Sequence, residues 1–212
     1  MSPREFESYF QQRAARFAAF YKSEPVSRML GRGALFDRLR FAVDIAVGVS
    51  AHTVLDVGCG SGPLFAPLAD HGIHVTGIDP AEAMVTLASE QAAVYPGMVD
   101  VEQRGWEQLT EVDAYDVAVA LGVFDYVDRP TDLLFRMGRA ARHVVGSFPS
   151  HGVRTTLRQY RYGRRGVRVR GYTVSDLDRM ASEAGLVVID RVPLGRAGQV
   201  VHFGRREPAA RD

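Results

Sequence analysis

The chain is predicted to be an α/β domain built on a mostly parallel sheet, and three observations support this fold class. Apolar runs of strand length alternate with helix-length segments, which is typical of parallel sheets covered by helices. Glycines occupy every second position directly after the first apolar run. The last two apolar runs have no helix between them, so they must pair antiparallel. A chain of 212 residues suits one such domain and is short for two.

The first fifty residues carry helical patterns and no strand pattern. Large side chains recur at helical spacing over residues 4–22, which predicts an aromatic face, and a second helix is expected over about residues 27–47, beyond a break at Pro25. The aromatic face can serve as packing surface or as a lid that closes over a ligand. We expect residues 1–50 to form a helical cap on a domain that spans residues 51–206.

Strands and helices alternate from residue 53 onward. Five parallel strand–helix units followed by a closing hairpin predict seven strands in total. The strands are expected at residues 53–57, 73–78, 99–103, 116–121, 143–147, 186–192 and 200–204. The helices are expected at residues 63–70, 81–93, 131–141 and 173–184, the last capped by Thr173 or Ser175 and ended by Gly185.

Two short motifs carry most of the functional information. Residues 54–62 read VLDVGCGSG, an apolar run that ends at Asp56 and turns through glycines, as a strand does when its backbone must approach a nucleotide-like ligand. Residues 75–79 read VTGID and end at Asp79, at the spacing expected of a ribose partner. The third glycine of a dinucleotide fingerprint would fall at Pro63, which disfavours NAD.

These motifs resemble those of the class I S-adenosylmethionine-dependent methyltransferases, and the resemblance covers roughly residues 53–204. It implies a Rossmann-like, seven-stranded, mostly parallel sheet with a C-terminal antiparallel hairpin, and S-adenosylmethionine as the cofactor. The cofactor-binding residues that it implies lie near the carboxyl ends of the first four strands, where open α/β sheets bind ligands. They are Asp56, Gly58, Cys59, Gly60, Gly62, Asp79, Pro80, Met84, Gly105, Trp106, Glu107, Leu121, Gly122 and Val123.

The resemblance also implies separate tasks within this set. The glycine turn holds the methionine part and the ribose, and Asp79 accepts both ribose hydroxyls. Trp106 stands where the family usually has an acidic residue, so it either stacks on adenine, with Glu107 accepting from the adenine amine, or belongs to the core. Cys59 is the only cysteine, which excludes an intramolecular disulfide, and inside the turn it is expected to be a small packing residue rather than a nucleophile.

Candidate catalytic residues follow the fourth and fifth strands. Asp125 and Tyr126 would face the transferring methyl group or the acceptor, although Asp125 could instead cap the next helix. His151 is the histidine that follows a strand on the ligand side, which makes it the best candidate for a general base, with a solvated loop histidine as the alternative.

Arginines and tyrosines alternate over residues 151–170. This segment is either solvated surface or an acceptor site, since guanidinium groups and tyrosine hydroxyls suit a carboxylate- or phosphate-bearing molecule. The candidate substrate-binding residues are Tyr21, Arg158, Tyr160 and Arg161.

Composition narrows the remaining function classes. The net charge is +1, so no global field attracts nucleic acid or a membrane surface. No histidine or glutamate pair has ligand spacing, so no metal is expected. The chain lacks a membrane-length apolar run and a signal-peptide pattern, so we expect a cytoplasmic protein; its oligomeric state is left open.

The sequence therefore predicts a methyltransferase that uses S-adenosylmethionine to methylate an oxygen or nitrogen atom of a small molecule. Two alternatives remain at this stage. The first is an RNA methyltransferase that uses the arginine-rich segment as a phosphate track. The second is a non-catalytic protein that binds S-adenosylmethionine as a partner of another enzyme.

Overall fold

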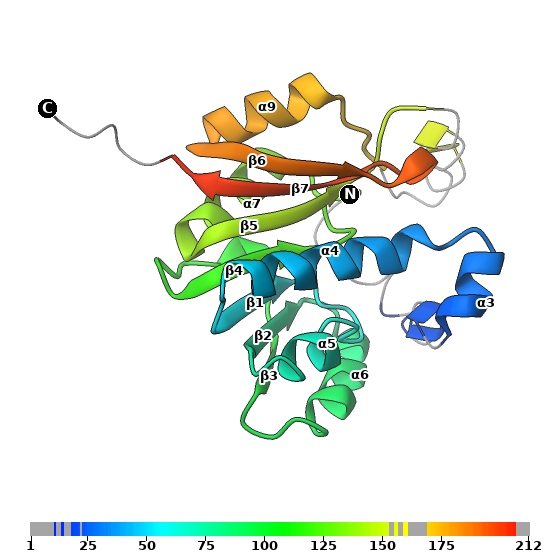
Figure 1. Ribbon diagram of the computed structural model, residues 1–212, viewed down its shortest axis with the longest axis vertical. Helices are drawn as coiled ribbons and strands as arrows, with labels where there is room; N and C mark the ends of the chain where they lie inside the picture. Colours follow the sequence, from blue (N-terminus) through cyan, green and yellow to red (C-terminus); the bar gives the residue numbers. More distant parts are fainter. Residues whose placement is uncertain are drawn as a thin grey trace, which may run out of the picture.

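Seven strands of the computed structural model form one mixed sheet in the order β3-β2-β1-β4-β5-β7-β6 (Figure 1). The structure describes residues 11, 14, 18–21, 23–152, 155–156, 159–160 and 169–206. Strands β1 to β5 are parallel to one another, and β7 lies antiparallel between β5 and β6. The predicted fold class, with its C-terminal antiparallel hairpin, is confirmed.

The strand bounds differ by at most two residues from those expected. The strands are β1 (Thr53–Val57), β2 (His74–Asp79), β3 (Val99–Gln103), β4 (Tyr115–Ala120), β5 (Ala141–Phe148), β6 (Leu186–Pro193) and β7 (Gln199–Arg205). The helices are α3 (Glu24–Met29), α4 (Ala34–Gly48), α5 (Phe65–Ala69), α6 (Glu82–Ala92), α7 (Pro130–Ala140) and α9 (Val174–Glu183). Three short 3-10 turns are η1 (Ala19–Tyr21), η2 (Trp106–Gln108) and η3 (Gly195–Ala197).

Helices cover both faces of the sheet, and neighbouring strand residues belong to different cores. In β1, Val54 packs in the cluster that contains residues of α4 and α5, whereas Leu55 packs in the cluster that contains residues of α7 and α9. Successive side chains of a strand point to opposite faces, and both of these are fully buried. The two cores therefore fix the sheet between them and leave its carboxyl edge to carry polar residues.

Helix α4 belongs to this packing as well as to the N-terminal part of the chain. Its residues Leu39, Ala42 and Ala46 are buried in the same cluster as α5. The division into a cap at residues 1–50 and a domain at residues 51–206 stays a prediction. Most of the aromatic positions expected over residues 4–22 lie outside the described residues.

The single helix expected over residues 27–47 is wrong, because the chain forms α3 and α4 there. Gly31 adopts a left-handed φ of 70°, and its N–H donates to the carbonyl of Arg28 at 3.0 Å, which ends α3. Pro25 does not break a helix either. It lies in the first turn of α3, where the missing N–H costs nothing.

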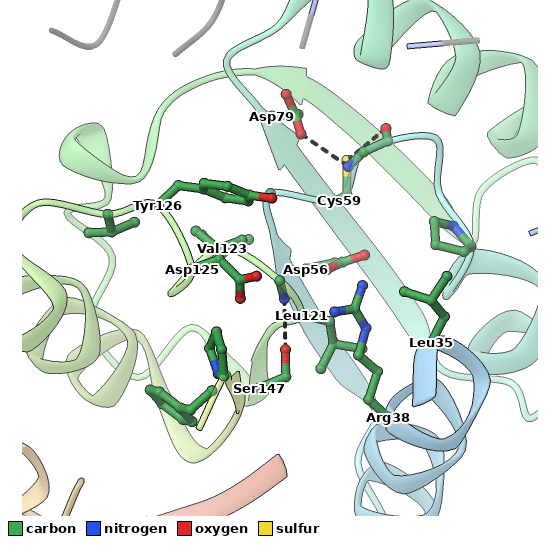
Figure 2. A pocket seen from close by; sticks show the side chains of 18 of the residues that line it. Leu35, Arg38, Asp56, Cys59, Asp79, Leu121, Val123, Asp125, Tyr126 and Ser147 are labelled. Carbon is green, nitrogen blue, oxygen red and sulfur yellow. Dashed lines mark hydrogen bonds between the residues drawn. The ribbon is translucent and has the colours of Figure 1, made fainter. Parts of the chain in front are cut away.

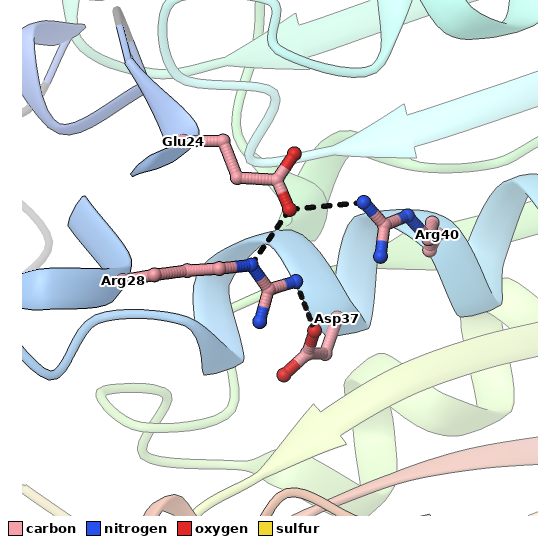
Figure 3. Close-up of polar contacts among 4 residues, drawn as sticks. All are labelled: Glu24, Arg28, Asp37 and Arg40. Atoms are coloured by element: carbon pink, nitrogen blue, oxygen red, sulfur yellow. Dashed lines mark hydrogen bonds and ion pairs between the residues drawn. The ribbon is translucent and has the colours of Figure 1, made fainter. Parts of the chain in front are cut away.

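Ion pairs tie α3 to α4 (Figure 3). The Glu24 carboxylate accepts from Arg28 Nε at 2.8 Å and from Arg40 Nη2 at 2.9 Å. Arg28 Nη2 in turn donates to Asp37 Oδ1 at 2.6 Å. Exposed pairs contribute little individually, but a network of four residues limits how α3 can move against α4.

No helix in the described part of the chain is long and apolar enough to cross a membrane.

Candidate active site

A cavity of about 960 Å³ lies at the carboxyl ends of the parallel strands. Strand ends and the loops that follow them form one side, and the start of α4 and the turn between β6 and β7 form other parts of the wall. Figure 2 shows Leu35 and Arg38 of α4 facing the residues that follow β1 and β4 across this space. Small-molecule sites usually enclose about 300–1,000 Å³, so this cavity is at the large end of that range.

The turn after β1 depends on its glycines. Gly58, Gly60 and Gly62 have φ angles of 69°, 57° and 75°, a region that side chains disfavour. A Cβ on Gly58 would lie 2.5 Å from Val123, and one on Gly62 would lie 2.5 Å from Phe65. Gly60 lines the cavity, and a Cβ there would meet no atom within 4 Å. The backbone at Gly60 is therefore open to close approach by a ligand, whereas Gly62 does not line the cavity and supports the turn.

Asp79 at the end of β2 fixes this turn. Its carboxylate accepts the N–H of Gly60 at 3.0 Å and the N–H of Ala81 at 2.9 Å. The side chain lines the cavity and is 9% exposed (Figure 2). The same carboxylate thus joins the ends of β1 and β2 and reaches the space where a ligand would lie.

Asp56 is the second carboxylate at this edge, and it is buried. Burial and the nearby charge of Asp79 raise the pKa of Asp56 to about 7, against the opposing effect of Arg38. Asp56 therefore changes its protonation close to neutral pH.

The loop after β3 supplies another part of the wall. Gly105, Trp106 and Glu107 all line the cavity. Trp106 is half-buried and packs against the core, and the guanidinium of Arg129 lies 5.5 Å from the centre of its ring. The sequence left open whether Trp106 belongs to the core or faces the cofactor. In the structure it lies at the edge of the core and also lines the cavity.

The predicted cofactor set is largely assembled at this one place. Apart from Gly62, every member lines the cavity: Asp56, Gly58, Cys59, Gly60, Asp79, Pro80, Met84, Gly105, Trp106, Glu107, Leu121, Gly122 and Val123. Cys59 is buried, and burial raises the pKa of its thiol well above the usual value. The functions of these residues stay predictions.

Sequence reasoning missed Arg38. Its Nη2 donates to the hydroxyl of Tyr21 at 2.9 Å, while its Nε is shielded from solvent and has no hydrogen-bond partner among the described residues. A Cβ on Gly122 would lie 3.0 Å from Arg38 Nη1, so the guanidinium covers the end of β4. One signal was available. Arg38 shares a helical face with Leu35 and Leu39, and an arginine within an apolar stripe indicates that its side chain is buried for a functional reason.

Two of the three candidate catalytic residues line the cavity. Asp125 is buried, and Asp125 and Tyr126 follow β4 on the cavity side (Figure 2). The loop is held in place by the Gly122 N–H, which donates to Ser147 Oγ at 2.8 Å. The helix-capping alternative for Asp125 is wrong, because the N-cap of α7 is Arg129.

The remaining acceptor-side candidates are His151, Tyr160, Tyr21, Arg158 and Arg161. His151 is exposed and is not among the described residues that line the cavity, and the same holds for Tyr160. Tyr21 lines the cavity through its contact with Arg38. Arg158 and Arg161 lie outside the described residues. In the part of the chain that the structure describes, no cluster of three or more histidine, cysteine, aspartate or glutamate side chains could hold a metal ion.

This strand order, the glycine turn after β1 and the carboxylate after β2 define the class I S-adenosylmethionine-dependent methyltransferases. The chain matches the methyltransferase domain family over residues 9–191 and belongs to that family. The chain therefore has the domain and the fold of the S-adenosylmethionine-dependent methyltransferases.

Sequence relatives include ubiquinone biosynthesis O-methyltransferases. That of Maricaulis maris is 31% identical over 130 residues, which cover 60% of this chain and 50% of that protein. That of a Methylobacterium species is 30% identical over 175 residues, which cover 76% of this chain and 68% of that protein. The chain spans about half the length of the first of these relatives.

Solved structures with the same fold extend over nearly the whole chain. The magnesium protoporphyrin IX methyltransferase of Synechocystis, with bound SAH, has a TM-score of 0.79 at 21% identity and covers 95% of this chain and 98% of its own. The 1,6-didemethyltoxoflavin-N1-methyltransferase of Burkholderia thailandensis has a TM-score of 0.71 at 19% identity, covering 98% and 92%. At these identities the likeness concerns the fold.

Proposed function

We propose that this methyltransferase methylates an oxygen or nitrogen atom of a small molecule that shares one cavity with the cofactor. The observation that carries the proposal is the size and construction of that cavity. At about 960 Å³ it has room for the cofactor and for a second molecule of moderate size. Its wall includes segments that precede the glycine turn in the sequence and segments that follow it. Because these segments surround the space, the acceptor would be enclosed rather than bound on an open surface.

The residues present fit the cofactor. Asp79 would accept the ribose hydroxyls, and the open backbone at Gly60 would allow the cofactor to approach the turn closely. Arg38 would bind the carboxylate of the amino-acid part, because it lines the cavity and a guanidinium pairs well with a carboxylate. Asp56 would neutralise the ammonium group at this end of the cavity, directly or through water.

S-adenosylmethionine supplies a methyl group that its sulfonium already activates. The protein's own contribution is therefore to align the acceptor and to exclude water. Asp125 and Tyr126 would lie beside the acceptor atom, and the Asp125 carboxylate would take the proton of an acceptor that arrives as a phenol or an ammonium. His151 remains a second candidate for this base, although it would have to reach the acceptor from outside the described lining.

Radiolabelled methyl transfer tests the proposal. Purified protein would be assayed with phenols, aromatic acids and amines, with total RNA as the competing acceptor class. We expect label in small molecules, and we expect Asp125→Asn to lower kcat about a hundredfold or more if the carboxylate is the base. Transfer to RNA alone would contradict the proposal. The near-neutral net charge gives RNA no electrostatic advantage.

A further inference from the structure

The turn between β6 and β7 brings a guanidinium and an amide to the cavity. We propose that the acceptor is an apolar molecule with one carboxylate, and that Arg196 and Gln199 bind this carboxylate. The inference rests on the proposed function, because it describes the acceptor of the same cavity.

The turn at residues 194–198 lies at the edge of the sheet that carries the cavity. Gln199 pairs with Phe148 in the β5–β7 ladder, so the turn begins beside the carboxyl end of β5, on the same edge as the glycine turn. The Leu194 N–H donates to the Gly198 carbonyl at 2.8 Å, and the Ala197 N–H donates to the Leu194 carbonyl at 3.1 Å. These bonds close residues 194–198 into a compact turn.

The turn also contacts β5. Gly198 has a φ of 130°, and a Cβ there would lie 2.1 Å from the carbonyl oxygen of Phe148. The two backbones therefore touch in a way that only glycine permits. Because backbone packs on backbone, this contact fixes the backbone from which Gln199 and the exposed side chain of Arg196 extend.

The arginines that line the cavity differ in whether a protein group pairs with them. The described residues that line the cavity include five arginines: Arg32, Arg38, Arg104, Arg129 and Arg196. The first four interact with neighbouring groups of the protein. Arg196 makes no hydrogen bond or ion pair within the described part of the chain, and the same is true of the Gln199 side chain. The turn thus offers a cation and an amide that pair with no group in the described part of the protein.

The wall around the turn also bears on the chemistry of the acceptor. Leu194 and Ala197 of the turn, Phe148 and Pro149 of β5 and its loop, and Leu35 of α4 also line the cavity. An acceptor in contact with them would be apolar over most of its surface. One guanidinium matches one planar carboxylate, which it can bind through two parallel hydrogen bonds, and the amide of Gln199 can add a third.

The test compares an acid with its uncharged isostere. Binding of 1-hydroxy-2-naphthoate and of 1-hydroxy-2-naphthamide to the full chain would be measured by calorimetry with SAH at saturation. We expect the acid to bind about tenfold tighter, which is the scale of one hydrogen-bonded charge pair at a partly exposed site. Arg196→Ala should remove this preference and leave the affinities for the amide and for SAH unchanged.

Arg142→Ala is the matched control, because Arg142 is exposed near the amino end of β5, at the opposite edge of the sheet. It should keep the full preference for the acid. The same pair of measurements with 2-hydroxybenzoate and its amide allows for a smaller acceptor. If neither acid is preferred, or if the preference survives Arg196→Ala, the inference is overturned.

The methyl-transfer assay separates this outcome from failure of the proposed function. Methylation of uncharged phenols without any preference for acids would leave the small-molecule function standing and overturn only the assignment of Arg196 and Gln199. Transfer to no small molecule would overturn both.

Discussion

The two halves of the cavity are built in different ways. The cofactor half comes mostly from residues 56–123, where loops follow the strand ends, and Tyr21 and Arg38 join it from the N-terminal part. The acceptor half combines described segments that are far apart in sequence, at residues 31–35, 125–129, 147–149, 155 and 194–199. The first half follows from local turns on a fixed sheet, whereas the second exists only after the cap, β5 and the C-terminal hairpin have come together.

The halves also differ in charge. Two carboxylates, Asp56 and Asp79, lie close together at the cofactor end. The far wall carries Arg196, a cation without a partner in the described part of the chain. A cationic group bound at the cofactor end would therefore lie near carboxylates. An anionic group of an acceptor bound at the far wall would lie near Arg196. The predictions below test whether the halves can be perturbed separately.

The largest effect is expected at Gly60. In Gly60→Val, a β-branched side chain would have to adopt a left-handed φ and would project into the open space beside the turn. Calorimetric titration with SAH should show affinity lowered by at least a hundredfold.

Gly97→Val provides the control for this substitution. Gly97 has a φ of 74° with no atom within 4 Å of an added Cβ, and it does not line the cavity. Both variants should lose a similar amount of stability, about 1–2 kcal/mol or more from the left-handed strain. Only Gly60→Val should lose SAH. Equal SAH affinity in the two variants would break the assignment of the turn.

A smaller effect is expected at Asp79. Asp79→Ala removes the acceptor of two backbone N–H groups and of the ribose hydroxyls, which should weaken SAH binding by about 1–3 kcal/mol, or roughly fivefold to more than a hundredfold. Asp79→Asn keeps one acceptor oxygen and should lose less. Affinity for the acid probe should change little, because Arg196 lies in the other half. Unchanged SAH affinity in Asp79→Ala would show that the ribose lies elsewhere.

Asp56 should make stability depend on pH. Its pKa is about 7 in the folded state, whereas an unperturbed aspartate has a pKa of 3.8. Between these two pH values the folded protein keeps a proton that the unfolded chain releases. The resulting stabilisation is complete below about pH 4 and is lost as the pH rises through about 7. Urea unfolding at pH 5 and pH 8 should show a smaller loss of stability on raising the pH in Asp56→Asn than in the unmodified protein.

His202 makes this comparison between proteins necessary. Burial lowers the pKa of His202 to about 4, so its contribution changes with pH in the opposite direction between about pH 4 and 6.5. The Asp56→Asn difference isolates the carboxyl because both proteins contain His202. An identical pH dependence in the two proteins would show that burial and the charge of Asp79 do not raise the pKa of Asp56.

The smallest effect is expected at Tyr21, where the cap meets the cofactor half. Tyr21→Phe removes the hydrogen bond to Arg38 and keeps the ring. The affinity for SAH should fall by about two- to tenfold, the scale of one hydrogen bond. If the loss appears in acceptor binding instead, Tyr21 acts as a substrate-binding residue, as its sequence position first indicated.

The same contrast explains what could be predicted from the sequence. Strand alternation and the glycine turn are local features, and they located the sheet and the residues around Asp56 and Asp79. Arg38 and Arg196 reach the cavity because segments distant in sequence come together; the apolar stripe around Arg38 indicates its burial, but not that it lies at the cavity. Gly31 was overlooked as a helix end because the apolar spacing continues across it from α3 into α4.

A crystal structure of the protein with SAH tests the central claim most directly. We predict that the ribose hydroxyls lie on Asp79, that the amino-acid carboxylate lies on Arg38, and that the space beside Arg196 and Gln199 stays clear of SAH. A ribose bound away from Asp79, or a cofactor that extends to Arg196, would contradict the division of this cavity into a cofactor half and an acceptor half.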